Sequence, residues 1–501
     1  MTRRASNLGL ALSTGGERSP AWRWLCEALR QEILCGRLRN GSRLPATRDL
    51  ARQYGLSRGT VVSAFEQLKA EGYLEGKVGS GSYVSQMLPE VLLQVTPSAA
   101  VASPRADKRP VSLGRYGRHA RLFAGYESRP TRAFRPNLPA LDLFPTELWA
   151  QLASRFLRSA PVGAFMGCDA LGYLPLRQAV AEYLVTTRGV RCSVGQTVIV
   201  SGVQEALDVA ARLMLDPGDR VCVENPGYPG AARVFEAWGA KIYGIPVDED
   251  GIQVQRLPRG NVRMVYVTPG HQFPLGTTMS LARRLELIQW AEQASALIIE
   301  DDYDSEYRYV GRPVPALQGL DRNGAVLYAG SFSKVLFPAL RLGYMVVPEN
   351  LVDRVEAIKS ITSRHAPLLE QAVLHAFIIE GHFGRHVRRM RTIYAERHGI
   401  LLDEAARKLQ GLLTITGVEA GLQTAAWFGF GIDGESAAAA ADKLGVDVTP
   451  LSRYARGKLP REGLQLGFAA VNRGEIKRGI EKLGRALEDL LRPHHRINHS
   501  E

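Results

Sequence analysis

The stretch "SFSKVLFPALRLGY" contains several side chains that could do chemistry. Lys334 is a candidate nucleophile, because a lysine amine can form a Schiff base with a carbonyl compound. Ser331 and Ser333 precede it, and Arg341 follows seven positions later. Hydroxyl groups and a guanidinium are ordinary ligands of a phosphate group. A lysine at this place could equally be a solvated surface charge, so the remainder of the chain has to decide between these interpretations.

The elements that position this lysine are short apolar runs that alternate with helical patterns from Thr197 onward. The predicted strands are "TVIVS", "RVCVE", "VRMVYVT", "ALIIE" and "AVLYAGS", and "SLARRLELIQWAEQ" is one of the helices between them. Wholly apolar strands that alternate with helices predict a parallel α/β sheet with both faces covered. Ligands of such sheets bind at the carboxyl ends of the strands. The residues that follow each strand are therefore the candidate site.

Polar or anion-binding groups follow several of these strands. Gly202 opens a helix after "TVIVS", where backbone N–H groups can hold an anion. Tyr228 follows "RVCVE", Asp301 begins an acidic cluster after "ALIIE", and Lys334 follows "AVLYAGSFS". Pyridoxal phosphate needs this set: an amine for its aldehyde, a carboxylate for its ring nitrogen and ligands for its phosphate. Taken singly, the tyrosine could be a packed loop residue and the acidic cluster a surface or metal patch.

The order of these pieces resembles fold-type I aminotransferases over residues 131–495. The matching stretches are "GYLPLRQAVAEYL", "VSGVQEALD", "PGDRVCVENPGY", "TPGHQFPLG", "EDDYDSEYRY" and "SFSKVLFPALRLGY". The resemblance implies that Lys334 is the Schiff-base lysine, Asp301 the partner of the ring nitrogen, Tyr303 the phenol near the cofactor's 3-hydroxyl and Tyr228 the stacking ring. It further implies a phosphate cup made of Ser201, Gly202, Val203, Gln204, Ser331, Ser333 and Arg341.

Residues 19–87 contain three helical patterns and a glycine-rich hairpin. Thr47 is the expected N-cap of the second helix and Ser57 that of the third. Two short helices separated by a turn at Gly55 are typical of a helix-turn-helix, whose second helix enters the major groove of DNA. The stretch "GYLEGKVGSGSYV" then predicts two short strands that form a wing. The alternative interpretation is a small helical bundle that packs on the rest of the chain.

The string "LRNGSRLPATRDLARQYGLSRGTVVSAFEQLKAEGYLEGKVGSGSYV" closely resembles the winged helix-turn-helix of GntR-type regulators. One departure is Ala46, where a serine is common. The third helix offers Ser57 at its start. The resemblance implies that the other DNA contacts come from the start of that helix, from the helix before it and from the wing: Arg48, Arg58, Thr60, Gly79 and Gly81.

Composition and charge agree with a soluble protein that binds a polyanion. Residues 1–135 hold 22 of the 63 Lys and Arg but 10 of the 50 Asp and Glu, so they carry almost the whole net charge of +13. A basic front segment on a near-neutral body favours a nucleic-acid partner. Residues 88–130 are predicted to be a basic, partly disordered linker. The chain has no apolar run that predicts a membrane span, and its five scattered cysteines indicate reduced thiols in the cytoplasm and no metal site.

The two halves together resemble the MocR/GabR family of transcription regulators. This resemblance implies an α/β fold with a small winged helix-turn-helix in front, a homodimer, a double-stranded DNA operator and control by pyridoxal phosphate or by an amine or amino acid. The alternative is an aminotransferase with an appended regulatory domain. Phe273 replaces an asparagine of working aminotransferases, Gln465 replaces their carboxylate-binding arginine, and Gly230 replaces an arginine of relatives that sense γ-aminobutyrate. We therefore expect regulation rather than catalysis, with Arg453 or Arg456 as alternative ligands of the effector.

Overall fold

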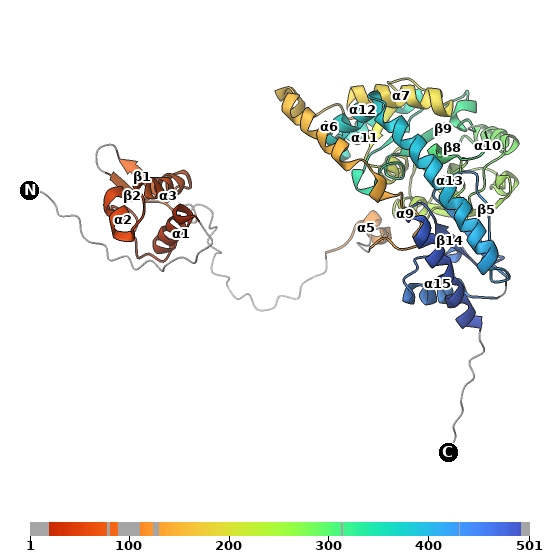
Figure 1. Cartoon of the computed structure of the whole chain (residues 1–501). Coiled ribbons are helices and arrows are strands. Elements are labelled where there is room, and N and C mark those ends of the chain that lie inside the picture. Colours follow the sequence, from red (N-terminus) through yellow and green to blue (C-terminus); the bar gives the residue numbers. More distant parts are fainter. Residues whose placement is uncertain are drawn as a thin grey trace, which may run out of the picture. The chain divides into compact units, whose positions relative to one another are not determined.

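The chain divides into two compact units, Met1–Val111 and Ser112–Glu501, which are described separately (Figure 1). The computed structural model describes residues 20–77, 81–88, 111–123, 130–311, 314–429 and 431–491. Gly79, a predicted DNA contact, lies outside these residues. Part of the segment predicted as a linker, 112–123, belongs to the second unit.

The first unit is a three-helix bundle with a two-stranded wing. Its helices are α1 (Ala21–Leu34), α2 (Thr47–Tyr54) and α3 (Arg58–Ala70), and its strands β1 (Leu74–Lys77) and β2 (Gly81–Val84) pair antiparallel. Leu25, Leu29, Leu50, Val61 and Leu68 are fully buried and form one core with the first residue of the wing. The predicted helix-turn-helix and wing are therefore both present.

Of the two N-caps predicted for this unit, the one of α3 is confirmed and the one of α2 is wrong. The Ser57 hydroxyl accepts a hydrogen bond from the Thr60 N–H at 3.1 Å, so Ser57 is confirmed as the N-cap of α3. Thr47 is not the N-cap of α2. Ala46 occupies that position, because its carbonyl already accepts from the Leu50 N–H at 3.1 Å, and it has no side-chain oxygen to cap the helix.

The second unit is built on an eight-stranded sheet of order β3-β10-β9-β8-β7-β4-β5-β6. Its strands are β3 (Thr197–Val200), β4 (Arg220–Asn225), β5 (Lys241–Asp248), β6 (Gly251–Ile252), β7 (Val262–Val267), β8 (Leu297–Asp302), β9 (Val326–Ser331) and β10 (Gly343–Val346). Neighbouring strands from β9 to β5 pair parallel, whereas β10 and β6 run antiparallel. The sheet is thus mixed: the five strands predicted from the sequence, β3, β4, β7, β8 and β9, share one direction, whereas β6 and β10, which were not predicted, run in the opposite direction.

Helices cover both faces of this sheet, as its apolar strands predict. Met264 packs in a cluster with residues of the helices on one face, and the next residue, Val265, packs in a cluster with α10 on the other. The first face carries α8 (Val203–Met214), α9 (Pro229–Ala237) and α11 (Val352–Thr362); the second carries α10 (Leu281–Ala294), α7 (Leu174–Arg188) and α12 (Leu368–Ile379).

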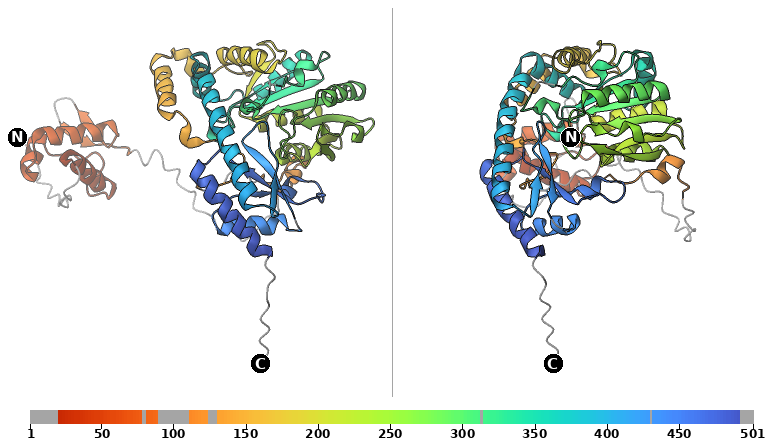
Figure 2. Two further views of the ribbon diagram at one scale, coloured as in Figure 1. Left: turned by 45° about the vertical axis from the view of Figure 1, so that its right-hand side comes forward. Right: turned by 90° about the vertical axis from the view of Figure 1, so that its right-hand side faces the viewer.

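A smaller antiparallel sheet follows, of order β11-β12-β14-β13, with β11 (Leu413–Ile415), β12 (Gln423–Phe428), β13 (Thr449–Pro450) and β14 (Gly463–Gly467). It is accompanied by α13 (His382–Lys408), α14 (Gly434–Lys443) and α15 (Arg473–Leu491). Figure 2 shows α13, in cyan, running along one side of the unit toward α15, in dark blue.

Two further helices complete the unit. They are α5 (Arg115–His119) and α6 (Thr146–Ser159). The Tyr116 ring of α5 contacts the Trp238 ring at a centroid distance of 5.2 Å. Within the described residues no helix is long and apolar enough to cross a membrane.

The N-cap of α3 gives a first prediction. Ser57→Ala removes the hydroxyl that accepts from Thr60 and should destabilise the start of α3 by about 1 kcal/mol. Amide hydrogen exchange of α3 peptides, followed by mass spectrometry, should become about fivefold faster. Ser63→Ala, at an exposed position of the same helix, is the matched control and should change exchange little. Equal effects of both substitutions would contradict the capping role.

Candidate functional site

The pairing of β10 brings two predicted phosphate-binding loops together. Gly343, the first residue of β10, lies opposite Val200 at the end of β3 and opposite Ser331 at the end of β9. Arg341 precedes β10 and therefore lies beside both loops. A Cβ placed on Gly202 would lie 3.6 Å from the Arg341 guanidinium. The structure thus places a guanidinium next to the glycine that opens α8.

The predicted phosphate-binding residues differ in which of their N–H and hydroxyl groups already have a hydrogen-bond partner. Gly202 is the N-cap of α8 and has a φ of +107°, a conformation that favours glycine. The Ser331 hydroxyl accepts from the Ser333 N–H at 3.2 Å, while the Ser333 hydroxyl is buried and has no partner. Ser201 donates its N–H to the Glu205 carboxylate at 2.5 Å.

The next two residues begin α8 and complete the predicted phosphate cup. Val203 is the first residue of the helix, and Gln204 follows it. The Gln204 amide donates to the Tyr228 hydroxyl at 2.8 Å, so its side chain orients the tyrosine. These two residues can therefore offer an anion their backbone N–H groups rather than a side chain.

Lys334 is half-buried in the loop after β9, and its amine is close to acidic groups. Its Nζ donates to the Asn137 carbonyl at 2.8 Å. Burial lowers the pKa of Lys334 to about 8, against the opposing effect of the carboxylates of Asp304 and Asp301. At pH 7 about a tenth of this lysine is therefore the neutral amine, which is the nucleophilic form, and half of it is neutral at about pH 8.

Asp301 lies at the end of β8 and is buried. Its Oδ2 accepts from the Tyr266 hydroxyl at 2.6 Å, whereas its Oδ1 has no partner. Burial raises the pKa of Asp301 to about 7, and the hydrogen bond from Tyr266 opposes this shift. A carboxylate with one free oxygen in such a place is suited to accept an N–H or a cation.

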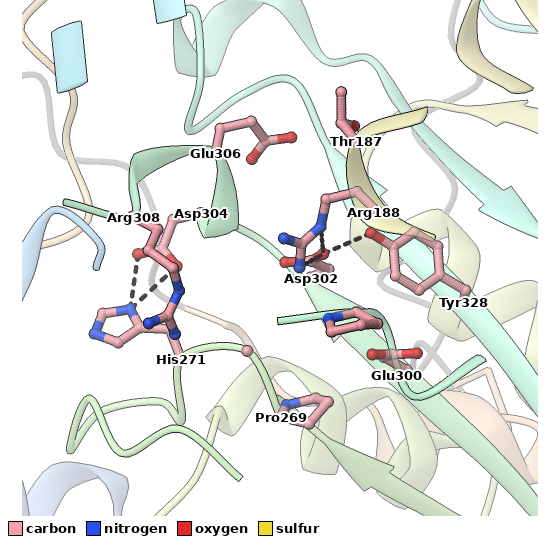
Figure 3. A network of polar contacts seen from close by, with 12 residues as sticks. Thr187, Arg188, Pro269, His271, Glu300, Asp302, Asp304, Glu306, Arg308 and Tyr328 are labelled. Carbon is pink, nitrogen blue, oxygen red and sulfur yellow. Dashed lines mark hydrogen bonds and ion pairs between the residues drawn. The ribbon is translucent and has the colours of Figure 1, made fainter. Parts of the chain in front are cut away.

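A buried histidine joins the site, although the sequence assigned it no role. His271 Nδ1 lies 2.9 Å from Asp304 and 3.1 Å from the Tyr303 hydroxyl, and His271 and Asp304 are only 3% and 1% exposed. When Nδ1 carries the proton and donates it to Asp304, the unpartnered Nε2 is an acceptor. Figure 3 shows the pair. Its two residues are 33 positions apart, so only the fold brings them together.

The acidic cluster at the end of β8 is buried, so it is not a surface patch. Asp301, Asp302 and Asp304 are all buried, and the described residues contain no group arranged to hold a metal ion. Asp302 forms a buried ion pair with Arg188 at 2.6 Å and accepts from the Tyr328 hydroxyl at 2.6 Å (Figure 3). Because Asp302 is paired in this way, its role is structural. Asp301 and Asp304 are the carboxylates of the cluster that remain for the candidate site.

Tyr228 follows β4 and lies among aromatic rings. Its ring centroid is 6.3 Å from Tyr266 and 5.7 Å from Phe273, and Phe273 lies 4.9 Å from Tyr454. Burial raises the pKa of Tyr228 to about 12, so its hydroxyl stays protonated. The structure thus connects the predicted stacking ring with the position where Phe273 replaces an asparagine.

The predicted DNA contacts lie on the first unit. Arg48 and Arg58 are exposed, at the first turns of α2 and α3, and Gly81 begins β2 of the wing. Thr60 is half-buried and lies 2.8 Å from the Ser57 hydroxyl. Arg43 was not predicted. A Cβ on Gly81 would lie 3.2 Å from its Nε, so this exposed arginine accompanies the wing.

Comparisons with known proteins agree with this division. Residues 24–84 match the family described as bacterial regulatory proteins, gntR family, and residues 146–483 match aminotransferase class I and II. The "Probable rhizopine catabolism regulatory protein MocR" of Rhizobium meliloti is 40% identical over 93% of this chain and 94% of its own length. The "HTH-type transcriptional regulator TauR" of Rhodobacter capsulatus is 30% identical over 95% of this chain and 98% of its own.

A solved structure supports the fold of the second unit. LysN, an α-aminoadipate aminotransferase from Thermus thermophilus complexed with N-(5′-phosphopyridoxyl)-L-leucine, is similar to this chain with a TM-score of 0.65 and 30% identity. The match covers 72% of this chain and 92% of LysN. The fold-type I architecture implied by the resemblance of residues 131–495 to aminotransferases is confirmed. The chain belongs to the MocR-type transcriptional regulators, in which a GntR-type helix-turn-helix unit precedes a unit of the class I and II aminotransferase family.

Proposed function

We propose that the second unit holds pyridoxal phosphate on Lys334, and that the cofactor or a primary amine bound there controls how the winged unit binds its DNA operator. The observation that carries this proposal is the half-buried Lys334 amine with a lowered pKa near Asp301, a buried carboxylate with an unpartnered oxygen. LysN, solved with a phosphopyridoxyl compound, supports it through the shared fold.

The residues present fit the cofactor. Asp301 Oδ1 and the Ser333 hydroxyl are buried without partners, and an unsatisfied buried polar atom costs about 1–3 kcal/mol. A pyridinium N–H would satisfy the first and a phosphate oxygen the second. Gly202 brings the start of α8 close to Arg341 without an intervening side chain, which suits a phosphate between them.

Pyridoxal phosphate, when bound, supplies an aldehyde carbon open to attack by primary amines and an electron-withdrawing ring. Lys334 supplies the amine, which burial keeps partly neutral. The Tyr303 hydroxyl, 3.1 Å from His271 Nδ1, can donate to the cofactor's hydroxyl while Asp304 orients the imidazole. Tyr228 is held by Gln204 and offers its ring face for stacking. Together these side chains bind and orient the cofactor.

The first unit is suited to double-stranded DNA. Exposed Arg58 stands at the first turn of α3, the part of a recognition helix that contacts base edges. Ser57 and Thr60 lie at the same helix start, Arg48 lies at the start of the preceding helix α2, and the wing adds Gly81 with Arg43. We infer that the arginines contact phosphates or bases of the DNA and that the glycines let the wing approach the sugar-phosphate backbone.

A homodimer formed by the second unit is also part of the proposal. Three apolar side chains of η2 (Val162–Met166) are exposed: Val162 by 84%, Phe165 by 66% and Met166 by 89%. Leu157 of the neighbouring α6 is also exposed. A cluster of large exposed apolar side chains usually marks an interface, and a symmetric pair of winged units would match a two-fold operator.

Aminotransferase catalysis is the second candidate, and the complete lysine, carboxylate and phosphate set favours it. Phe273 weighs against it, because its ring packs on Tyr454 and cannot donate a hydrogen bond to the cofactor. Gln465 replaces the arginine that binds a substrate carboxylate in aminotransferases, and a neutral amide cannot form that ion pair. Catalytic keto-acid production from an amino donor would favour the enzyme, whereas binding of the donor without turnover favours the regulator.

Lys334→Ala should abolish the absorption band that pyridoxal phosphate gains on binding covalently, because the variant has no amine at this place. Basal DNA affinity should stay within about twofold, since the winged unit has its own core. Absorbance titration and fluorescence anisotropy with operator DNA measure the two effects. Lys482→Ala, an exposed lysine of α15, is the control and should keep both properties. A normal band in Lys334→Ala would refute the assignment.

Cofactor capture should depend on pH through the Lys334 amine. Because the pKa is lowered to about 8, the rate of capture should rise about tenfold per pH unit below pH 8 and level off above it. Stopped-flow absorbance with the cofactor-free protein measures this rate. An increase that continues toward pH 10 would show that the lysine has its ordinary pKa.

Arg58→Ala should weaken operator binding about 5- to 30-fold at moderate salt and reduce the salt dependence of the affinity by about one charge. Cofactor absorption should not change, because Arg58 belongs to the other unit. Arg322→Ala, an exposed arginine of the second unit, is the matched control. Undiminished affinity of Arg58→Ala for the operator would exclude Arg58 as a contact.

A further inference from the structure

Gln465 borders the site around Lys334, although it is far from it in the sequence. It lies in β14 opposite Ala425 of β12, and Gln423 projects from the same face of that small sheet two residues earlier. The Gln423 amide oxygen accepts from the Asn137 N–H at 2.7 Å, and the Asn137 carbonyl accepts from Lys334 Nζ at 2.8 Å. The face of the small sheet that carries Gln465 therefore also carries a residue that is hydrogen-bonded to the loop holding the Lys334 amine.

The Gln465 amide is fully buried and only half satisfied. Its exposed fraction is 0%, and its Oε1 accepts from the Tyr454 hydroxyl at 2.7 Å, while its Nε2 has no partner. Tyr454 packs on Phe273, and Phe273 lies 6.1 Å from Tyr303. The unpartnered donor thus belongs to the same wall of side chains as the predicted cofactor residues. An unsatisfied buried donor at a candidate site points to a ligand atom that pairs with it.

The neighbouring arginines are already paired with carboxylates. Arg453 forms an ion pair with Glu435 at 2.6 Å and Arg456 one with Glu236 at 2.8 Å. Arg308, near His271 in Figure 3, pairs with Glu419 at 2.6 Å. The sequence had offered the first two as ligands of an effector. With these partners, a ligand carboxylate that reaches Gln465 would have to displace Glu435 or Glu236 before it could pair with either arginine.

A carboxylate at Gln465 would be buried against a neutral amide, without an arginine to form an ion pair with it. The acidic side chains of Asp301 and Asp304 would repel it, and the amide could return only one neutral hydrogen bond. A hydroxyl group avoids both costs. It accepts from Nε2, and it would instead donate to the amide oxygen if the amide were turned, so it satisfies Gln465 in either orientation.

We propose that the effector is a primary amine that carries a hydroxyl group where amino acids carry a carboxylate, that is, an amino alcohol recognised by Gln465. This inference rests on the proposed function, in which an amine exchanges with Lys334 on the cofactor. Such an exchange forms one C–N bond and breaks another, with the proton passing to the displaced lysine amine, so it needs no oxidant or other co-reactant.

Matched ligand pairs test the proposal on the full chain loaded with pyridoxal phosphate. Ethanolamine is compared with glycine, and 3-amino-1-propanol with β-alanine, because in each pair a CH2OH group takes the place of the carboxylate. Cofactor absorbance and the shift in Tm both report binding. Each amino alcohol should bind with a Kd about tenfold lower than its amino acid. Equal affinities, or a preference for the amino acids, would overturn the inference.

Substitutions at Gln465 distinguish a loss of ligand recognition from a general loss of protein structure. Gln465→Arg supplies the missing cation and should reverse the preference toward the amino acids, while Gln465→Leu should remove the preference altogether. Gln410→Arg, at an exposed position, is the control and should keep the preference for amino alcohols. If Gln465→Arg still preferred amino alcohols over amino acids, another residue would be responsible for recognising the ligand.

The same titrations distinguish failure of this inference from failure of the proposed function. Wild-type protein that gains no covalent cofactor band refutes the proposed function, and the inference with it. A normal band that responds to neither class of amine overturns the inference alone. Both Gln465 variants should keep the band, because Lys334 and the phosphate residues are unchanged.

Discussion

The candidate site depends on one strand, β10, which runs antiparallel between β3 and β9. The backbone of β10 lies so close to the ends of β3 and β9 that a Cβ on Gly343 would lie 2.7 Å from the Gly330 carbonyl and 3.1 Å from the Gly202 Cα. Glycine at this place lets the loop after β3, the loop after β9 and Arg341 meet. An anion-binding corner and the lysine loop therefore share one edge of the sheet, as ligand sites of α/β sheets do.

Burial of the charged groups then determines the protonation states of Lys334 and Asp301 at this edge of the sheet. The same desolvation that lowers the pKa of Lys334 to about 8 raises the pKa of Asp301 to about 7, so each group is poised near neutrality instead of fixed in its charge. A cofactor that pairs with both would hold the carboxylate ionised and use the neutral amine. The acidic surroundings that suit a pyridinium ring disfavour a second carboxylate, which connects cofactor binding to the choice of effector at Gln465.

Much of this site could be predicted from the sequence, because each strand is an apolar run and the residue after it is polar. Lys334, Asp301 and Tyr228 were found in this way, and Ser57 was found from its place before α3. The direction of β10 could not be predicted, since an apolar run has the same pattern in parallel and antiparallel strands. The His271–Asp304 pair and the ion pairs of Arg453 and Arg456 depend on long-range contacts that local patterns do not contain. The DNA and cofactor contacts stay predictions.

The central claim is that Lys334 belongs to a sensor whose ligand state changes DNA binding. The most direct measurement is operator affinity of the cofactor-loaded full chain, titrated with a primary amine and repeated with Lys334→Ala. The account predicts that the amine shifts the affinity of the wild-type protein by about fivefold or more and leaves the variant unchanged. An affinity that ignores the amine in the loaded wild type, or that shifts equally in the variant, would contradict it.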